Sequence, residues 1–160
     1  MQTRDISHSL VTLASELLHG PERSGQAYML NTGDVGLLGS LDAISADGAS
    51  RTSQGGASIA AHVDHLQFGL SLMNAWSGGA NPWDTADFTA SWRISTVSDA
   101  EWHDLRSRLH AESQRWLEAM RTRRELTDEE ANILLGAVAH LAYHVGAIRQ
   151  IDKATRGPRA

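Results

Sequence analysis

Hydrophobic residues recur every three or four positions in four long segments of this chain, which is the spacing of an amphipathic helix. The first segment covers about residues 5–19 and the second about residues 58–76. The third extends from Ser98 to a basic run at residues 121–124, and the fourth from Thr127 to about Lys153. The apolar stripes are Ile6, Leu10, Leu13 and Leu17; Ile59, Val63, Leu66, Leu70 and Met73; Trp102, Leu105, Leu109, Trp116 and Met120; and Ile133, Ala137, Leu141, Ile148 and Ile151. The pattern predicts four helices.

Polar residues and turn formers mark the ends of these helices. Gly20 and Pro21 are expected to end the first, because glycine suits the position after a helix and proline cannot continue one. Two capping boxes are expected, one formed by Ser98 and Glu101 and one by Thr127 and Glu130. We interpret the basic run at residues 121–124 as cations that stabilise the end of the third helix.

The connections between the helices differ in length. The last two helices are joined by a few residues and should be antiparallel neighbours, whereas residues 20–57 and 77–97 form long connections that we expect to cross an end of the bundle. The first contains a short helical segment at residues 34–44. The second carries three aromatic residues among turn formers, Trp83, Phe88 and Trp92, as is typical of a lid or a partner surface. No stretch alternates like a strand, so we predict one all-α domain over residues 1–160.

Composition narrows the class of protein. The chain has 160 residues, a net charge of −5 and a pI near 5.9, which disfavours electrostatic binding of nucleic acid. It has no cysteine, which excludes disulfides, thiolate zinc sites and a cysteine nucleophile. The N-terminus lacks a basic-then-apolar signal pattern, and no apolar run approaches the roughly 20 residues needed to cross a bilayer. We therefore expect a cytoplasmic protein that binds neither nucleic acid nor a membrane.

Histidines in the apolar helical segments are the strongest chemical signal. His140 and His144 are four residues apart, so their imidazoles lie on one face of the fourth helix, about one turn apart. That spacing suits adjacent positions around one divalent cation. The second helix offers His62 and His65, which are three residues apart and which helical phase alone does not separate. Neutral imidazoles in an apolar wall need polar partners, and a metal ion is one such partner.

Other residues have plainer interpretations. We expect Asp64 to be exposed and Tyr143 to face a neighbouring helix. Arg149 is expected either to reach an anionic substrate or to pair with an acid of the third helix such as Glu112. The remaining histidines are interpreted as solvated or structural: His8, His19, His103 and His110. Three tryptophans are assigned to the core: Trp76, Trp102 and Trp116.

With histidines on its second and fourth helices, the chain resembles the DinB/YfiT-like superfamily of metalloenzymes. The segment SIAAHVDHLQFGL is similar to the second helix of that family, which carries a single ligand histidine. The segment HLAYHVGAIRQI is similar to its last helix, in which two histidines four residues apart precede a glycine. The resemblance covers most of the chain. Ala147 stands where many members have a glutamine after that glycine, so no function of that glutamine is carried over.

The resemblance implies a four-helix bundle in an up-down-down-up arrangement with long crossover connections. It also implies a divalent metal held by His65, His140 and His144, and so favours His65 over His62 as the ligand from the second helix. Relatives commonly form homodimers. Characterised branches include transferases and isomerases that use small thiols such as bacillithiol, mycothiol or glutathione.

Three histidine ligands leave a coordination position open, as catalytic sites do and structural zinc sites do not. We therefore expect a metal-dependent enzyme of the thiol-dependent S-transferase type, with Zn²⁺ as the first candidate metal and Ni²⁺ as the next. Because the chain has no cysteine, the thiol must come from a small molecule. His62 is then a candidate catalytic residue, a proton acceptor one turn from His65. The alternatives are a metal-hydroxide hydrolase, a non-catalytic bundle that binds metal or senses a ligand, and an interaction module without metal.

Overall fold

The computed structural model describes residues 3–23, 25–122 and 126–158, and these residues are largely helical. The long helices are α1 (Thr3–His19), α4 (Ile59–Ser77), α5 (Asp99–Arg121) and α6 (Asp128–Ile151); the shorter elements are α2 (Gly36–Asp42), α3 (Ala46–Ala49), and the 3-10 turns η1 (Trp83–Thr85), η2 (Ala90–Trp92) and η3 (Lys153–Thr155). The described residues form no strand and one isolated antiparallel bridge, between Thr52 and Ser58. The prediction of an all-helical fold is confirmed.

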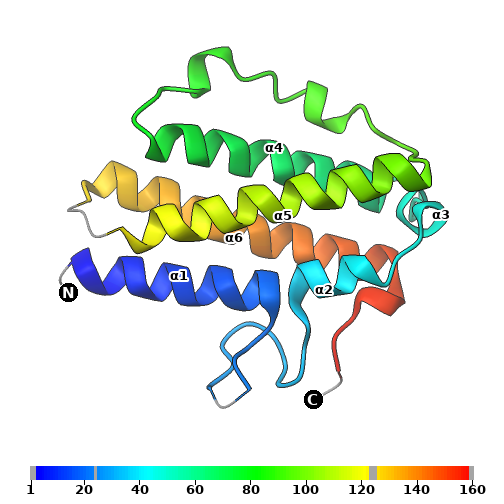
Figure 1. Ribbon diagram of the computed structural model, residues 1–160, viewed down its shortest axis with the longest axis horizontal. Helices are drawn as coiled ribbons and strands as arrows, with labels where there is room; N and C mark the ends of the chain where they lie inside the picture. Colours follow the sequence, from blue (N-terminus) through cyan, green and yellow to red (C-terminus); the bar gives the residue numbers. More distant parts are fainter. Residues whose placement is uncertain (1–2, 24, 123–125, 159–160) are drawn as a thin grey trace.

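The four long helices lie side by side (Figure 1). In that view α1 and α6 run from left to right, and α4 and α5 run from right to left. Helix α5 packs against α4 and α1, and helix α6 packs against α1 and α4. Each long helix therefore contacts two of the others, and their apolar faces meet in one core.

The core is built from the predicted stripes. Trp116 is fully buried, and Trp102 is buried with its indole N–H donating to the carbonyl oxygen of Ile44. Trp76 is half-buried and packs against the core. The expectation of a core position is thus confirmed for Trp102 and Trp116, whereas Trp76 lies at the edge of the core. The bond from Trp102 explains how a polar indole N–H is accommodated inside.

The ends of the helices follow the predicted signals. Helix α1 ends at His19, and Gly20 follows with a φ of 87°. A Cβ at Gly20 would lie 2.0 Å from the carbonyl oxygen of Asp34, so the backbone of the next connection crosses there. Both capping boxes are present, at the start of α5 and at the start of α6. Of the basic run, Arg121 closes α5, whereas Arg123 and Arg124 lie outside the described residues.

The two long connections take different paths. Residues 20–58 hold α2 and α3 near one end of the long helices (Figure 1). Residues 78–98 instead return along the length of α4, because α4 and α5 run in the same direction. This differs from the expectation that both connections cross an end.

Buried carboxylates fix the first connection. The side chain of Glu16 on α1 accepts hydrogen bonds from the backbone N–H groups of Tyr28, Met29 and Leu30, at 2.7 to 3.1 Å. Asp34 accepts from the backbone N–H of Gly36 at 2.8 Å and from the Arg149 guanidinium at 2.9 Å. Backbone groups that would otherwise be unpaired in an irregular segment are thereby satisfied.

Two expectations for α6 need correction. Arg149 pairs with Asp34 and not with Glu112, which instead contacts Arg115 and Asn74. Tyr143 does not face a neighbouring helix, since 68% of it is exposed. The reason is rotation about the helix axis: with His144 turned inward, the preceding side chain points about one hundred degrees away. Asp64 on α4 is likewise half-buried where exposure was expected.

Helix α6 is also the one described helix that is long and apolar enough, by length and composition alone, to cross a membrane. Its most apolar window has a mean hydropathy of 1.4, and 33% of that window is buried. The expectation that no apolar run approaches this length was too strict, because glycine, alanine and histidine interrupt the large apolar residues without adding charge.

Candidate metal centre

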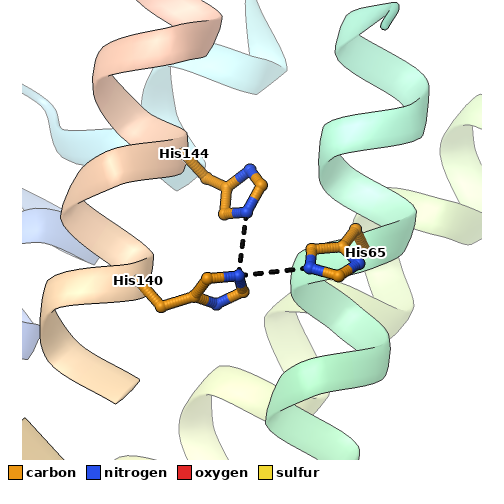
Figure 2. Close-up of side chains that lie close together, drawn as sticks. All are labelled: His65, His140 and His144. Carbon is orange, nitrogen blue, oxygen red and sulfur yellow. Dashed lines mark hydrogen bonds between the residues drawn. The ribbon is translucent and has the colours of Figure 1, made fainter. Parts of the chain in front are cut away.

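Three histidines from two helices converge between α4 and α6 (Figure 2). The Nε2 atom of His140 lies 3.1 Å from Nε2 of His65 and 3.0 Å from Nε2 of His144. One ligand atom from each of the three lies within 4.8 Å of the others. Within the described part of the chain, this is the one group of three such side chains that could hold a metal ion.

Two separations among the three nitrogens suit binding to a single ion. Two imidazole nitrogens bound to one Zn²⁺ at about 2.0–2.1 Å lie about 3.0 to 3.4 Å apart, depending on the angle between them. The two measured separations fall at the short end of that range. No carboxylate belongs to the group among the described residues, so the donor set is all imidazole, which suits zinc, nickel and copper.

Hydrogen bonds fix which nitrogen of His65 carries the proton. Its Nδ1 lies 2.8 Å from Oγ of Ser91, and that hydroxyl donates to the carbonyl oxygen of Phe88 at 2.9 Å. Because the hydroxyl proton is used on Phe88, the Ser91 oxygen accepts from the Nδ1–H of His65. The lone pair of His65 is thereby left on Nε2, the atom that faces the other two histidines.

His62 lies behind His144 rather than inside the group. Its Nδ1 is 2.8 Å from Nδ1 of His144, and both side chains are buried. When His144 Nδ1 donates to His62, its Nε2 is free to bind a metal. Geometry therefore separates the two candidates that helical phase left open: His65 directs a nitrogen into the group, and His62 contacts one of its members from outside.

The four imidazoles are poised to be neutral. Burial, and then the nearby His140 and His62, lowers the pKa of His65 to about 4. Burial, followed by His140, His62 and His65, lowers the pKa of His144 to about 3. Burial also lowers the pKa values of His62 and His140. Neutral imidazole is the form that binds metal, so the site needs no deprotonation at neutral pH.

The 78–98 connection covers one side of the group. The indole of Trp92 stacks on the ring of His65, with centroids 4.2 Å apart and planes 25° apart, and meets the edge of His62 at 5.5 Å. Ser91 beside it is buried, while Trp92 itself is 40% exposed. The sequence indicated Trp92 as part of a lid; it did not indicate Ser91, since a serine among turn formers carries no spacing signal.

An apolar cavity of about 550 Å³ opens beside the histidines. Its lining residues come from α4, from α6 and from the 78–98 connection: His65, Leu66, Phe68, Gly69, Leu70, Leu72, Met73, Trp83, Phe88, Ile133, Gly136, Ala137, His140 and Leu141. The rings of Phe68 and Phe88 meet edge to face at 5.8 Å, which joins the connection to α4 on this side. His65 and His140 are the polar side chains of the cavity wall, so a molecule bound there would meet the three-histidine group.

The four remaining histidines, His8, His19, His103 and His110, are exposed, in agreement with their plain interpretation.

Comparison of the chain with models of protein families, with curated proteins and with solved structures gave no match. The class that fold and site define is therefore a helical protein with a three-histidine group that could bind a metal ion.

Proposed function

We propose that this chain is a bundle of the DinB/YfiT-like type, in which α1, α4, α5 and α6 form an up-down-down-up arrangement. The directions of the four helices in Figure 1 support the proposal, as do the contacts of each with two others. The histidine-bearing segments of α4 and α6 are the ones that resemble the family. In this proposal His65, His140 and His144 hold one divalent metal ion, Zn²⁺ or Ni²⁺.

The protein is further proposed to be a metal-dependent enzyme of the thiol-dependent S-transferase type. The observation that carries this is the position of the three Nε2 atoms beside an apolar cavity, with three protein ligands and not the four of a closed structural site. A divalent ion with an open position lowers the pKa of a thiol or water bound to it. In this proposal, residues around the three histidines have different roles in holding the ligands and in the reaction.

Ser91 and His62 orient two of the ligands, since each occupies the Nδ1 side of an imidazole whose Nε2 faces the group. Trp92 shields the ring of His65 from water. His62 is also the proposed proton acceptor of the reaction. Its hydrogen bond from His144 uses the same Nδ1 lone pair, so the two roles exclude one another, and the contact supports the positioning role. The thiol comes from a small molecule such as bacillithiol, mycothiol or glutathione. A homodimer, which the family resemblance supports, and a cytoplasmic location, which the sequence pattern favours, complete the proposal.

A hydrolase is the second candidate, favoured by one observation. Bacillithiol, mycothiol and glutathione are polar or anionic, yet no lysine or arginine in the described part of the chain lines the cavity next to the histidines. In a hydrolase the co-substrate is water, which needs no cationic side chain to bind it. The two activities differ in the second substrate, so a panel with and without thiol separates them.

Metal analysis of protein purified without a histidine tag is the first test. We expect about one divalent ion per chain, and loss of the ion in the His140→Ala/His144→Ala variant with most of its helicity retained. Full metal content in that variant would overturn the site. The metal-loaded protein is then incubated with each thiol and a panel of electrophiles while thiol loss is followed. If the metal binds and no thiol is lost, but esters or amides are hydrolysed, the result favours the hydrolase. If the metal binds and neither activity is detected, the result favours a non-catalytic bundle that binds metal or senses a ligand.

A further inference from the structure

The cavity beside the three-histidine group has a chemical character of its own. Leucines, a methionine and an isoleucine form its floor, and Phe68, Trp83 and Phe88 add aromatic rings. Of its fourteen lining residues, three have polar ring nitrogens: His65, His140 and Trp83, whose indole N–H is its one polar group. Among the residues that the structure describes, no Asp, Glu, Lys or Arg lines it.

This lining excludes one class of ligand and fits another. A carboxylate, sulfonate or phosphate placed here would lose its hydration and meet no cation, which costs several kcal/mol for an isolated charge. An uncharged aromatic or alicyclic body would instead exchange water for apolar contacts and edge-to-face ring packing. The volume of about 550 Å³ lies within the range of about 300–1,000 Å³ common to small-molecule sites.

We propose that this cavity binds the apolar body of the substrate, a small uncharged molecule with an aromatic or alicyclic group. Its polar reactive end faces His65 and His140, the polar end of the wall. This proposal names the class of electrophile for the transferase function proposed above. It rests on that function only in calling the bound molecule a substrate. Binding itself needs the cavity and not the metal.

Two glycines on α6 offer a matched test of location. Gly136 lines the cavity, and a Cβ added there meets nothing within 4 Å. Gly146 lies on the same helix with the same freedom, but lines a different, polar pocket with Asp34 and Arg149. Replacement of either glycine raises helix propensity, so both variants should fold.

The experiment measures binding of neutral N-phenyl-naphthylamine to the full chain by its fluorescence, with and without metal, at a protein concentration varied about tenfold. Anilinonaphthalene sulfonate is the charged comparison probe, because it has nearly the same aromatic rings as the neutral probe and adds one negative sulfonate. We expect the neutral probe to bind about tenfold or more tightly than the sulfonate. Affinity for it should fall progressively in Gly136→Ala, Gly136→Leu and Gly136→Phe, and stay within about twofold of the parent in the same series at Gly146. Melting curves establish that each variant is folded.

Equal affinity for the two probes, or equal losses in both series, would overturn the proposal. Binding that weakens as protein concentration rises would overturn it as well, because the cavity would then be covered by a second copy of the chain. Failure of the proposed function has a different signature: the probe binds as expected, but the parent protein holds no metal or the His140→Ala/His144→Ala variant keeps it.

Discussion

Both ring nitrogens of His144 have a partner. Nε2 lies 3.0 Å from Nε2 of His140, and Nδ1 lies 2.8 Å from Nδ1 of the buried His62. In metal sites, the partner of the second nitrogen fixes the tautomer and the orientation of the ring, and its loss typically weakens metal binding about 10-fold to 100-fold. In the proposed metal site, His62 therefore acts on metal binding through His144.

We predict that His62→Phe weakens metal affinity by about 10-fold to 100-fold, because the ring volume is kept while the acceptor for His144 is lost. His62→Gln should recover part of this loss, since its amide oxygen can accept. Competition with a chromophoric chelator measures both affinities, and His103→Phe on an exposed position of α5 is the control. Parent-like affinity in His62→Phe would show that the bond between the two imidazoles does not orient His144.

At this scale, spacing predicted some residues and not others. A spacing of four positions puts His140 and His144 on one face of a helix, and the structure places them together. His62 and His65 are both turned inward by three-residue spacing, so their different roles needed the distances. Ser91 could not be predicted, because its contact with His65 depends on the path of a connection 26 residues away in sequence. Tyr143 was wrongly expected to face a neighbouring helix, since it is 68% exposed. Of the two alternatives for Arg149, the pairing with Glu112 is wrong, because its partner Asp34 lies in a connection whose path the sequence does not reveal.

Among the elements, the 78–98 connection matters most to the site. It contacts α4 through η2, where Ser91 bonds to His65 and Trp92 stacks on the same ring. Its other aromatic residues, Trp83 and Phe88, line the cavity. One hydroxyl thus joins His65 to the backbone of the segment that walls the cavity, since Ser91 also donates to the carbonyl oxygen of Phe88.

We predict that Ser91→Ala loosens this connection and lowers metal affinity together. The alanine leaves the Nδ1–H of His65 without its acceptor and removes the bond to Phe88. Hydrogen exchange of backbone amides at residues 86–93 should accelerate, and chelator competition should show weaker binding. Ser95→Ala, an exposed position of the same connection, serves as the control. Unchanged exchange in Ser91→Ala would contradict the assigned link.

The long helices were the predictable elements, and the connections were not. Period and capping boxes located α4, α5 and α6 to within a few residues. Helix α3 has four residues in a Gly/Ser-rich stretch, too short for a period to register. The path of residues 20–35 depends on Glu16, whose carboxylate binds backbone groups 12 to 14 positions later. Such contacts leave no periodic trace in a sequence.

Asp34 joins that connection to α6, and we predict a large cost for its removal. Its side chain is 1% exposed and accepts from both Arg149 and the backbone of Gly36. Asp34→Ala leaves a largely buried guanidinium without its partner and should lower the free energy of unfolding by about 3 kcal/mol. Asp42→Ala removes an ion pair whose carboxylate is 76% exposed and should cost at most about 1 kcal/mol. Urea unfolding measures both; similar costs would show that burial does not distinguish the two pairs.

Across the whole molecule, the neutral imidazoles couple folding to pH. An unfolded histidine takes up a proton near pH 6.5, whereas His65 in the folded chain does so only near about 4 and His144 near about 3. Between these values the unfolded state binds more protons than the folded state, so the free energy of unfolding falls as the pH falls. The contribution of the two residues is complete above about pH 6.5 and is lost progressively down to their folded pKa values.

We therefore predict that the Tm of the metal-free protein falls as the pH is lowered from about 7 to about 4.5, a range in which most carboxylates stay ionised. The His140→Ala/His144→Ala variant should show a shallower fall, because it lacks two of the shifted groups and also the charge of His140, which adds to burial in lowering the pKa of His65. Carboxylates common to both chains contribute equally and cancel in the comparison. Equal slopes in the two chains would mean that protonation elsewhere controls acid stability, and that the imidazoles titrate alike in the folded and unfolded states.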